Sequence, residues 1–171
     1  MRTRQRDRDV PGPEQPWNEI VPGLWMGGHV WHDSRTGELQ LAVVGTEFDL
    51  VVSLYSAPGH GPAAGVEHLV VPMPDGPLTG AQLRTAERIA GSVARAVRSG
   101  GTVLVRCHSG YNRSGLITAQ ALVDLGHRVP DAVDLIRRRR SPWALHNEVF
   151  VQYLTTGLGV SALLSELDAI A

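Results

Sequence analysis

The sequence predicts an α/β fold in which a central, mostly parallel (mixed) sheet is flanked by helices. Apolar runs typical of buried strands alternate along the chain with segments whose apolar residues recur at helical spacing. Glycine and proline pairs separate these segments, as expected for turns. The chain has 171 residues, of which 43% are hydrophobic, so it can bury one sizeable core. These observations favour a single layered domain.

The amino-terminal end is predicted to lie outside this domain. Residues 1–16 are polar, charged and interrupted by prolines, so we expect a disordered tail followed by one domain over 17–171. A basic anchor is a weaker alternative, because Asp7 and Asp9 dilute the positive charge. The tail lacks the apolar core of a signal peptide, and no stretch approaches the roughly 20 apolar residues of a membrane span. We therefore expect a cytoplasmic protein without membrane association.

The first elements of the domain are predicted from turn residues and apolar runs. Ile20-Val21 and Leu24–Met26 flank the turn pair Pro22-Gly23, which indicates a hairpin. Residues 27–38 are predicted to be irregular, and residues 39–44 fit either a strand or a short helix. Further strands are predicted where β-branched and other apolar residues cluster, over 50–55, 66–71 and 102–106.

Helical periodicity is clearest after the strand over 66–71. Thr79 fits an N-cap, and Gly100-Gly101 fits the end of the helix. The apolar residues between them recur at helical spacing: Leu83, Ala86, Ile89, Ala90, Val93, Ala94 and Val97. Shorter helices are predicted over 113–125, 131–139, 147–154 and 162–170, with Pro130 at the start of the second of these.

Charge and cysteine content exclude several function classes. The net charge of −1 excludes a generally basic nucleic-acid binder, although not a local basic patch, and we expect no nucleic-acid partner. The single cysteine, Cys107, excludes a disulfide framework and a Cys-rich zinc site. His29, His32 and Asp33 are too few for a convincing metal site, so a surface turn is favoured. We expect neither a metal nor a cofactor.

The segment from Cys107 to Ser114 has the composition of an anion site. It follows a β-branched strand and opens a helix, so its backbone N–H groups and the helix dipole would face one point. Gly110 permits a backbone conformation that a side chain would resist, and Arg113 can bind two phosphate oxygens with its planar guanidinium. The same N–H groups favour the thiolate of Cys107, which is a nucleophile. A buried cysteine that only packs is the alternative.

These residues resemble the signature loop of the cysteine-dependent protein tyrosine phosphatases, which reads His-Cys-x5-Arg-Ser/Thr, and the chain length resembles the compact dual-specificity branch. The resemblance implies that Cys107 is the nucleophile, that Arg113 binds phosphate, and that the Ser114 hydroxyl helps the thiolate leave. It also implies that the residues of the signature loop bind phosphate through their backbone: His108, Ser109, Gly110, Tyr111, Asn112 and Arg113. The similarity extends over roughly residues 17–155, including the Asn147–Leu154 segment.

An aspartate at the matching distance completes the resemblance. Asp75 lies 107 − 75 = 32 positions before the cysteine, where the family carries its general acid. Asp75 would protonate the leaving oxygen and then activate water, which predicts an acidic pH optimum. A simple Pro-Asp-Gly turn is the alternative. One departure stands out, because Arg106 replaces the histidine that precedes the family's nucleophile. Arginine cannot reproduce the hydrogen bonds of a neutral imidazole.

The function expected from the resemblance is metal-free hydrolysis of phosphomonoesters, with phosphotyrosine and also phosphoserine or phosphothreonine proteins as the substrate class. An RNA 5′-phosphatase or phosphoinositide phosphatase is an alternative, although residues 108–112 hold no Lys or Arg. The others are a catalytically weak phosphate-binding module, suggested by Arg106, and rhodanese-like sulfur transfer. The basic run Arg137–Arg140 is interpreted as a solvated helix face with Asp131 and Asp134 as partners, or as a patch that steers an anionic substrate.

Overall fold

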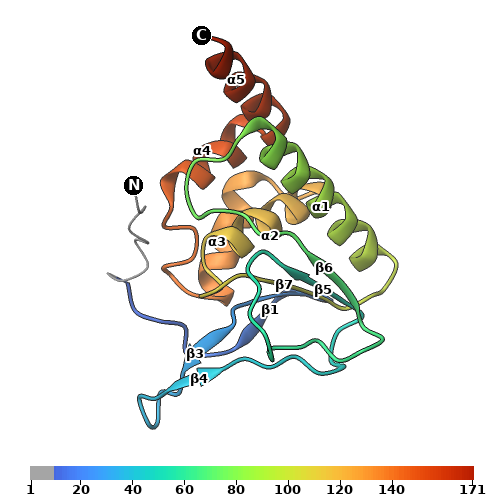
Figure 1. Ribbon diagram of the computed structural model, residues 1–171, viewed down its shortest axis with the longest axis vertical. Coiled ribbons are helices and arrows are strands. Elements are labelled where there is room, and N and C mark those ends of the chain that lie inside the picture. The colour runs from blue at the N-terminus through green and yellow to red at the C-terminus, as the bar shows by residue number, and fades with distance from the viewer. Residues whose placement is uncertain (1–9) are drawn as a thin grey trace.

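The computed structural model describes residues 10–171 and confirms the predicted α/β class. Five strands form the central sheet in the order β1-β2-β7-β5-β6. The β1–β2 pair is antiparallel, and the β2–β7, β7–β5 and β5–β6 pairs are parallel. The strands of this sheet are β1 (Trp17–Val21), β2 (Leu24–Gly27), β5 (Leu50–Ser53), β6 (Glu67–Val70) and β7 (Val103–Arg106). The helices lie together on one side of the sheet (Figure 1).

The helices begin and end close to the predicted positions. They are α1 (Gly80–Arg98), α2 (Arg113–Asp124), α3 (Val129–Arg139), α4 (Glu148–Thr156) and α5 (Leu158–Ile170). Thr79 is the N-cap of α1 and forms a full capping box with Gln82, which satisfies two N–H groups of the first turn. Helix α5 begins four residues earlier than predicted and is tied to α1 by a bidentate Arg84–Glu166 pair. Among residues 10–171, no helix combines the length and apolarity needed to cross a membrane.

The sheet separates two apolar clusters, as the alternation of side chains along a strand requires. On the helix side, Met26, Val52 and Val105 contribute to the main core. On the opposite side, Val51 and Leu104 pack with Val44 and Phe48, and the Trp17 and Trp25 rings contact Phe48 edge-on. The segment between β2 and β6 therefore covers the face that the helices leave open (Figure 1).

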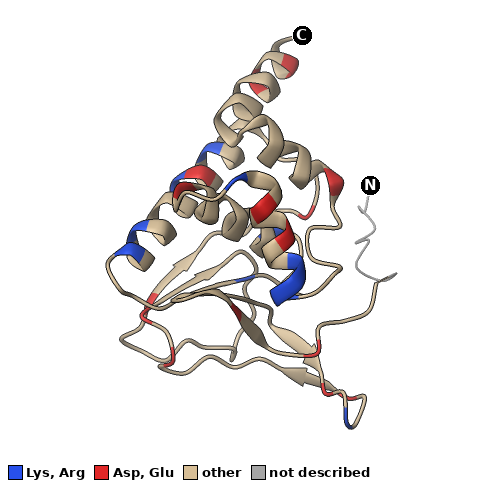
Figure 2. Cartoon of the chain, turned by 180° about the vertical axis from the view of Figure 1, so that it is seen from behind, with Lys and Arg blue, Asp and Glu red and all other residues tan. Residues whose placement is uncertain are grey.

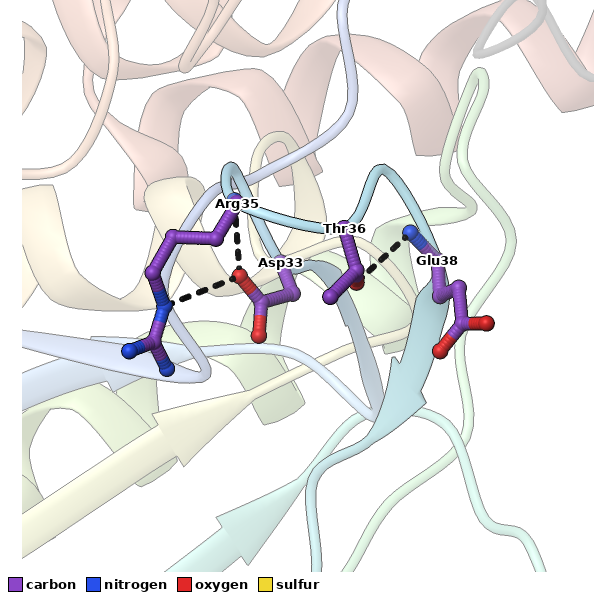
Figure 3. A network of polar contacts seen from close by, with 4 residues as sticks. All are labelled: Asp33, Arg35, Thr36 and Glu38. Carbon is purple, nitrogen blue, oxygen red and sulfur yellow. Dashed lines mark hydrogen bonds and ion pairs between the residues drawn. The ribbon is translucent and has the colours of Figure 1, made fainter.

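The expectation that residues 27–38 are irregular is wrong in part. Strands β3 (Val30–His32) and β4 (Leu39–Leu41) form a short antiparallel hairpin, and residues 39–44 contribute a strand instead of a helix. The turn is closed by side chains, because the Asp33 carboxylate accepts from the backbone N–H of Arg35 at 2.8 Å and Thr36 Oγ1 accepts from Glu38 at 3.3 Å (Figure 3). Short local contacts of this kind leave little periodicity in the sequence.

Part of the predicted 1–16 tail lies outside the described residues, and the rest contacts the domain. The backbone carbonyls of Pro11 and Gln15 accept hydrogen bonds from the Tyr111 hydroxyl (2.7 Å) and from Arg140 Nη1 (2.7 Å). The Pro13 carbonyl accepts from the backbone N–H of His32 at 2.7 Å. Residues 11–15 therefore run beside the segment that follows β7.

Candidate active site

Cys107 stands at the carboxyl end of the central strand. Strand β7 pairs in parallel with β2 on one side and β5 on the other, so three strand ends meet there. In open α/β sheets, ligands bind outside the carboxyl ends of such strands. The Cys107 side chain is buried, and its Sγ lies 3.3 Å from the Ser114 hydroxyl in the first turn of α2. The thiol, its strand and the start of a helix are thus brought together as predicted.

The loop from Cys107 to Arg113, here called the signature loop, has its carbonyl groups turned outward. Each carbonyl oxygen from Cys107 to Asn112 accepts one hydrogen bond from a donor beyond the loop. In chain order the donors are His29 Nδ1 (2.9 Å), His29 N (2.8 Å), Arg140 Nη2 (3.0 Å), Arg140 Nε (3.1 Å), Leu145 N (3.1 Å) and Leu116 N (2.8 Å). Because C=O and N–H point in opposite directions across a trans peptide, this arrangement turns the N–H groups inward.

The inward N–H groups form a nest of hydrogen-bond donors. No hydrogen bond within residues 10–171 uses the backbone N–H of Gly110, Asn112 or Arg113. A concave set of such donors at a helix N-terminus is suited to an anion. Gly110 is required for this shape, because its φ is +74° and an added Cβ would lie 2.4 Å from the carbonyl carbon of Gly27.

Arg113 is buried beside the nest with part of its guanidinium unsatisfied. Its Nη1 makes a long contact of 3.4 Å with the Met73 carbonyl, and its Nε has no hydrogen-bond partner among the described residues. The guanidinium carbon lies 5.7 Å from the centre of the Tyr55 ring, within the range of a cation–π contact. A buried donor without an acceptor is costly, so this site favours an anionic ligand.

Asp75 is joined to the signature loop by hydrogen bonds. One carboxylate oxygen accepts from the side-chain amide of Asn112 at 3.1 Å, and the other accepts from that of Asn147 at 2.8 Å. Asn147 also caps α4 by accepting from the backbone N–H of Val149. The structure therefore places Asp75, 32 residues before Cys107 in sequence, at the rim of the same loop.

A cavity of about 530 Å³ opens beside Arg113. It lies between the end of β5 and the β6–α1 loop and is lined by Leu54, Tyr55, Ser56, Pro72, Met73, Pro74 and Arg113. The Tyr55 ring meets the His108 ring edge-on, with centroids 5.2 Å apart. An apolar ring that entered beside Arg113 would therefore find aromatic side chains as neighbours.

Not every residue of the signature loop points its side chain toward this cavity. Tyr111 is buried, and its hydroxyl donates to the Pro11 carbonyl, so it packs under residues 11–15. His108 and Ser109 are half-buried, with His108 Nδ1 lying 3.4 Å from Ser109 Oγ. The Asn112 side chain is committed to Asp75 and to the backbone N–H of Asn147.

Arg106, the departure from the family pattern, is directed away from the loop carbonyls. It is 1% exposed and donates to Ser53 Oγ (2.9 Å), the His60 carbonyl (2.9 Å) and the Gly61 carbonyl (2.7 Å). None of these partners is a carboxylate, and burial lowers the pKa of Arg106 to about 10. Arg106 thus fastens β7 to the segment after β5.

The interpretation of Arg137–Arg140 as a solvated helix face is wrong for two of its members. Arg140 is buried and holds the signature loop, and Arg137 donates to the carbonyls of Ala144 and Leu145. No ion pair with Asp131 or Asp134 forms among the described residues. Figure 2 shows the charges carried by the helices, with acidic residues on α3 ahead of its arginines. Helical spacing from Val133 and Ile136, both buried, could have placed Arg140 on the inner face.

His29 is the other residue that sequence reasoning missed. The favoured interpretation as part of a surface turn is wrong for His29, which is 1% exposed and contacts the signature loop, although His32 and Asp33 do lie at the β3–β4 turn. No group of three or more potential metal ligands (His, Cys, Asp or Glu) gathers within residues 10–171. A lone histidine after Gly27-Gly28 carries no local signal of its tertiary contacts.

Comparison with family models and with curated proteins gives no match for this sequence. Solved structures are similar. Human DUSP28 is 29% identical with a TM-score of 0.66, and the match covers 91% of this chain and 97% of DUSP28. Tk-PTP in its active form is 23% identical (TM-score 0.58; 84% and 96% covered). OH1 from the Orf virus, described as a tyrosine phosphatase, is 16% identical (TM-score 0.60; 86% and 88% covered), a likeness of fold. The chain belongs to the cysteine-dependent protein tyrosine phosphatase superfamily.

Proposed function

We propose that this protein hydrolyses phosphomonoesters through a phosphocysteine intermediate on Cys107. The observation that carries the proposal is the combination of a single thiol with outward loop carbonyls and a buried arginine Nε that lacks an acceptor. This combination supports binding of a tetrahedral dianion directly above the sulfur. Phosphate binding alone would need no aspartate at the rim, whereas hydrolysis does.

In the first step, the Cys107 thiolate attacks phosphorus while the bond from phosphorus to the leaving oxygen breaks. Asp75 donates its proton to that oxygen, so the product leaves as an alcohol or a phenol. The loop N–H groups and Arg113 hold the three equatorial oxygens throughout, because their positions do not change between substrate and transition state.

In the second step, Asp75, now a carboxylate, takes a proton from water as the water oxygen attacks phosphorus. The bond from sulfur to phosphorus breaks, and inorganic phosphate and the Cys107 thiolate are released. The Ser114 hydroxyl, 3.3 Å from the sulfur, can donate a hydrogen bond to the departing thiolate. Because Asp75 must be protonated in the first step, we expect an acidic pH optimum.

The substrate class that we propose is phosphotyrosine in proteins, with phosphoserine and phosphothreonine as further members. The cavity beside Arg113 supports this choice, because Tyr55 and His108 offer ring faces and edges to a phenyl group. Arg106 and Arg140 are buried and occupied by backbone carbonyls. They are therefore not free to recognise the extra phosphates of a phosphoinositide or an RNA 5′-end.

The test compares wild type, Cys107→Ser and Asp75→Asn on para-nitrophenyl phosphate and phenyl phosphate, with a chelator present. We expect the serine variant to be inactive, because its hydroxyl is a poor nucleophile. Asp75→Asn should lose roughly a hundredfold on phenyl phosphate, whose leaving group needs a proton, and much less on para-nitrophenyl phosphate. Absence of turnover by wild type, or full activity of Cys107→Ser, would reject the proposal. Phosphopeptides, phosphoinositides and triphosphorylated RNA then rank the substrate classes.

A further inference from the structure

His29 grips two successive peptide groups of the signature loop. Its ring Nδ1 lies 2.9 Å from the Cys107 carbonyl oxygen, and its backbone N–H donates to the His108 carbonyl at 2.8 Å. The residue follows β2, 78 positions before the cysteine, and is 1% exposed. Arg140 and the Leu145 backbone hold the later carbonyls, so among the described residues His29 supplies the one side chain that holds the peptide joining Cys107 to His108.

The contact fixes the protonation state of the ring. A carbonyl oxygen can only accept, so Nδ1 must carry the proton. Nε2 has no hydrogen-bond partner among the described residues, and a proton there would leave a buried donor unsatisfied. Burial lowers the pKa of His29 to about 4, and the nearby charges of Arg106, His60 and His108 act in the same direction. The rings of Tyr55 and His60 pack against it. The imidazole is therefore neutral.

A fixed carbonyl also fixes the other half of its peptide. The Cys107–His108 peptide is planar and trans, so holding its oxygen outward directs the His108 N–H toward the sulfur side of the loop. An N–H dipole aimed at that side stabilises a thiolate and a bound anion. Rotation of this one peptide would present a carbonyl oxygen in place of an N–H.

We propose that His29 is the positioning residue of the nucleophile: its neutral imidazole orients the Cys107–His108 peptide and so maintains both the thiolate and the anion nest. The inference rests on the proposed function of Cys107 as the nucleophile. It also accounts for Arg106, since the imidazole absent from position 106 is supplied from the end of β2. Arg106 is then free to bind Ser53, His60 and Gly61.

The test uses readouts that do not require turnover. Cys107 is the sole cysteine, so alkylation by iodoacetamide reports on one thiol, and its rate against pH gives the midpoint of thiolate formation. Calorimetry with inorganic phosphate reports on the anion nest. Two amide variants form a matched pair, because His29→Asn can place an N–H near the position of Nδ1 whereas His29→Gln places it near that of Nε2.

We expect His29→Gln and His29→Ala to raise the alkylation midpoint by about one pH unit, a tenfold change in thiolate fraction, and to weaken phosphate binding about tenfold. His29→Asn should stay within about threefold of wild type in both measurements. His60→Ala removes a neighbouring buried ring that has no hydrogen bond to the loop carbonyls, and should leave the midpoint unchanged.

Equal behaviour of the Asn and Gln variants, or an equal shift in His60→Ala, would overturn the positioning role. The Asn and Gln pair keeps the test decisive if His29→Ala does not fold. A wild-type protein that binds phosphate and is alkylated at low pH, but has no phosphatase activity, would reject the proposed function and leave the role of His29 standing.

Discussion

The side-chain amide of Asn147 donates a hydrogen bond of 2.8 Å to the Asp75 carboxylate, and this contact joins the β6–α1 loop to the first turn of α4. Two segments 72 residues apart thereby hold one proton donor. Asn112 holds the second oxygen of the same carboxylate from the signature loop. The position of the acid is thus set by amides that neither gain nor lose protons.

Replacing Asn147 by Ser separates these two tasks. Serine is a good N-cap, so α4 is retained, but its short side chain cannot reach Asp75. We expect kcat for phenyl phosphate to fall roughly tenfold and kcat for para-nitrophenyl phosphate to change little, because only the poorer leaving group needs a well-placed acid. Glu148→Gln, an exposed change in the same turn, serves as the control. Equal losses on both substrates would contradict the assignment.

Arg106→His restores the family's residue but should not restore a function. The imidazole cannot reach Ser53, His60 and Gly61 together, so buried carbonyls lose their donors. We expect the free energy of unfolding, measured with urea, to fall by roughly 2 kcal/mol. Turnover should not rise, since His29 already contacts the Cys107 carbonyl. A variant that is faster and equally stable would show that Arg106 impairs the site.

Arg140→Lys should weaken anion binding although it preserves the charge. The guanidinium holds the Ser109 and Gly110 carbonyls with two different nitrogens, a geometry that one ammonium group cannot reproduce. We expect the inhibition constant of inorganic phosphate to rise about tenfold. Arg139→Lys alters an exposed neighbour and should have no effect. If the two variants behave alike, Arg140 does not shape the loop.

The protein should lose stability between pH 6.5 and pH 4 through His29. The pKa of His29 is about 4 in the folded chain, against 6.5 when unfolded, so in this interval the unfolded state binds the proton. The contribution is complete above pH 6.5 and disappears as the pH falls toward 4, amounting to about 2 kcal/mol between pH 7 and pH 5. Urea unfolding at both pH values should show a smaller loss for His29→Asn than for wild type. A His127→Asn control should keep the full loss.

Much of the fold was predictable because it depends on local patterns. The capping box at Thr79 and the helical spacing from Leu83 to Val97 define α1 without tertiary information. The signature loop was predictable because its neighbours in sequence are also its neighbours in space: a β-branched strand, an internal glycine and a helix start. Within the site, Cys107, Arg113 and Ser114 therefore followed from one contiguous segment.

The residues that hold the loop from outside could not be predicted in the same way. His29 lies 78 residues away from its partner, and no periodicity connects an isolated histidine to a carbonyl oxygen. Arg140 contacts its loop carbonyl across 30 residues, and four consecutive arginines look alike unless helical phase is followed from Ile136. Positions that serve a loop through its backbone leave no requirement in the sequence of the loop itself.

The attachment of residues 11–15 gives the chain a mechanical lever on its own catalytic loop. The Pro11 carbonyl holds the Tyr111 hydroxyl, and the Gln15 carbonyl holds the same guanidinium that binds Ser109 and Gly110. A molecule that lifted this strip from the surface would remove both acceptors in a single motion. Force applied near the start of the chain would thus be transmitted to the phosphate site without passing through the sheet.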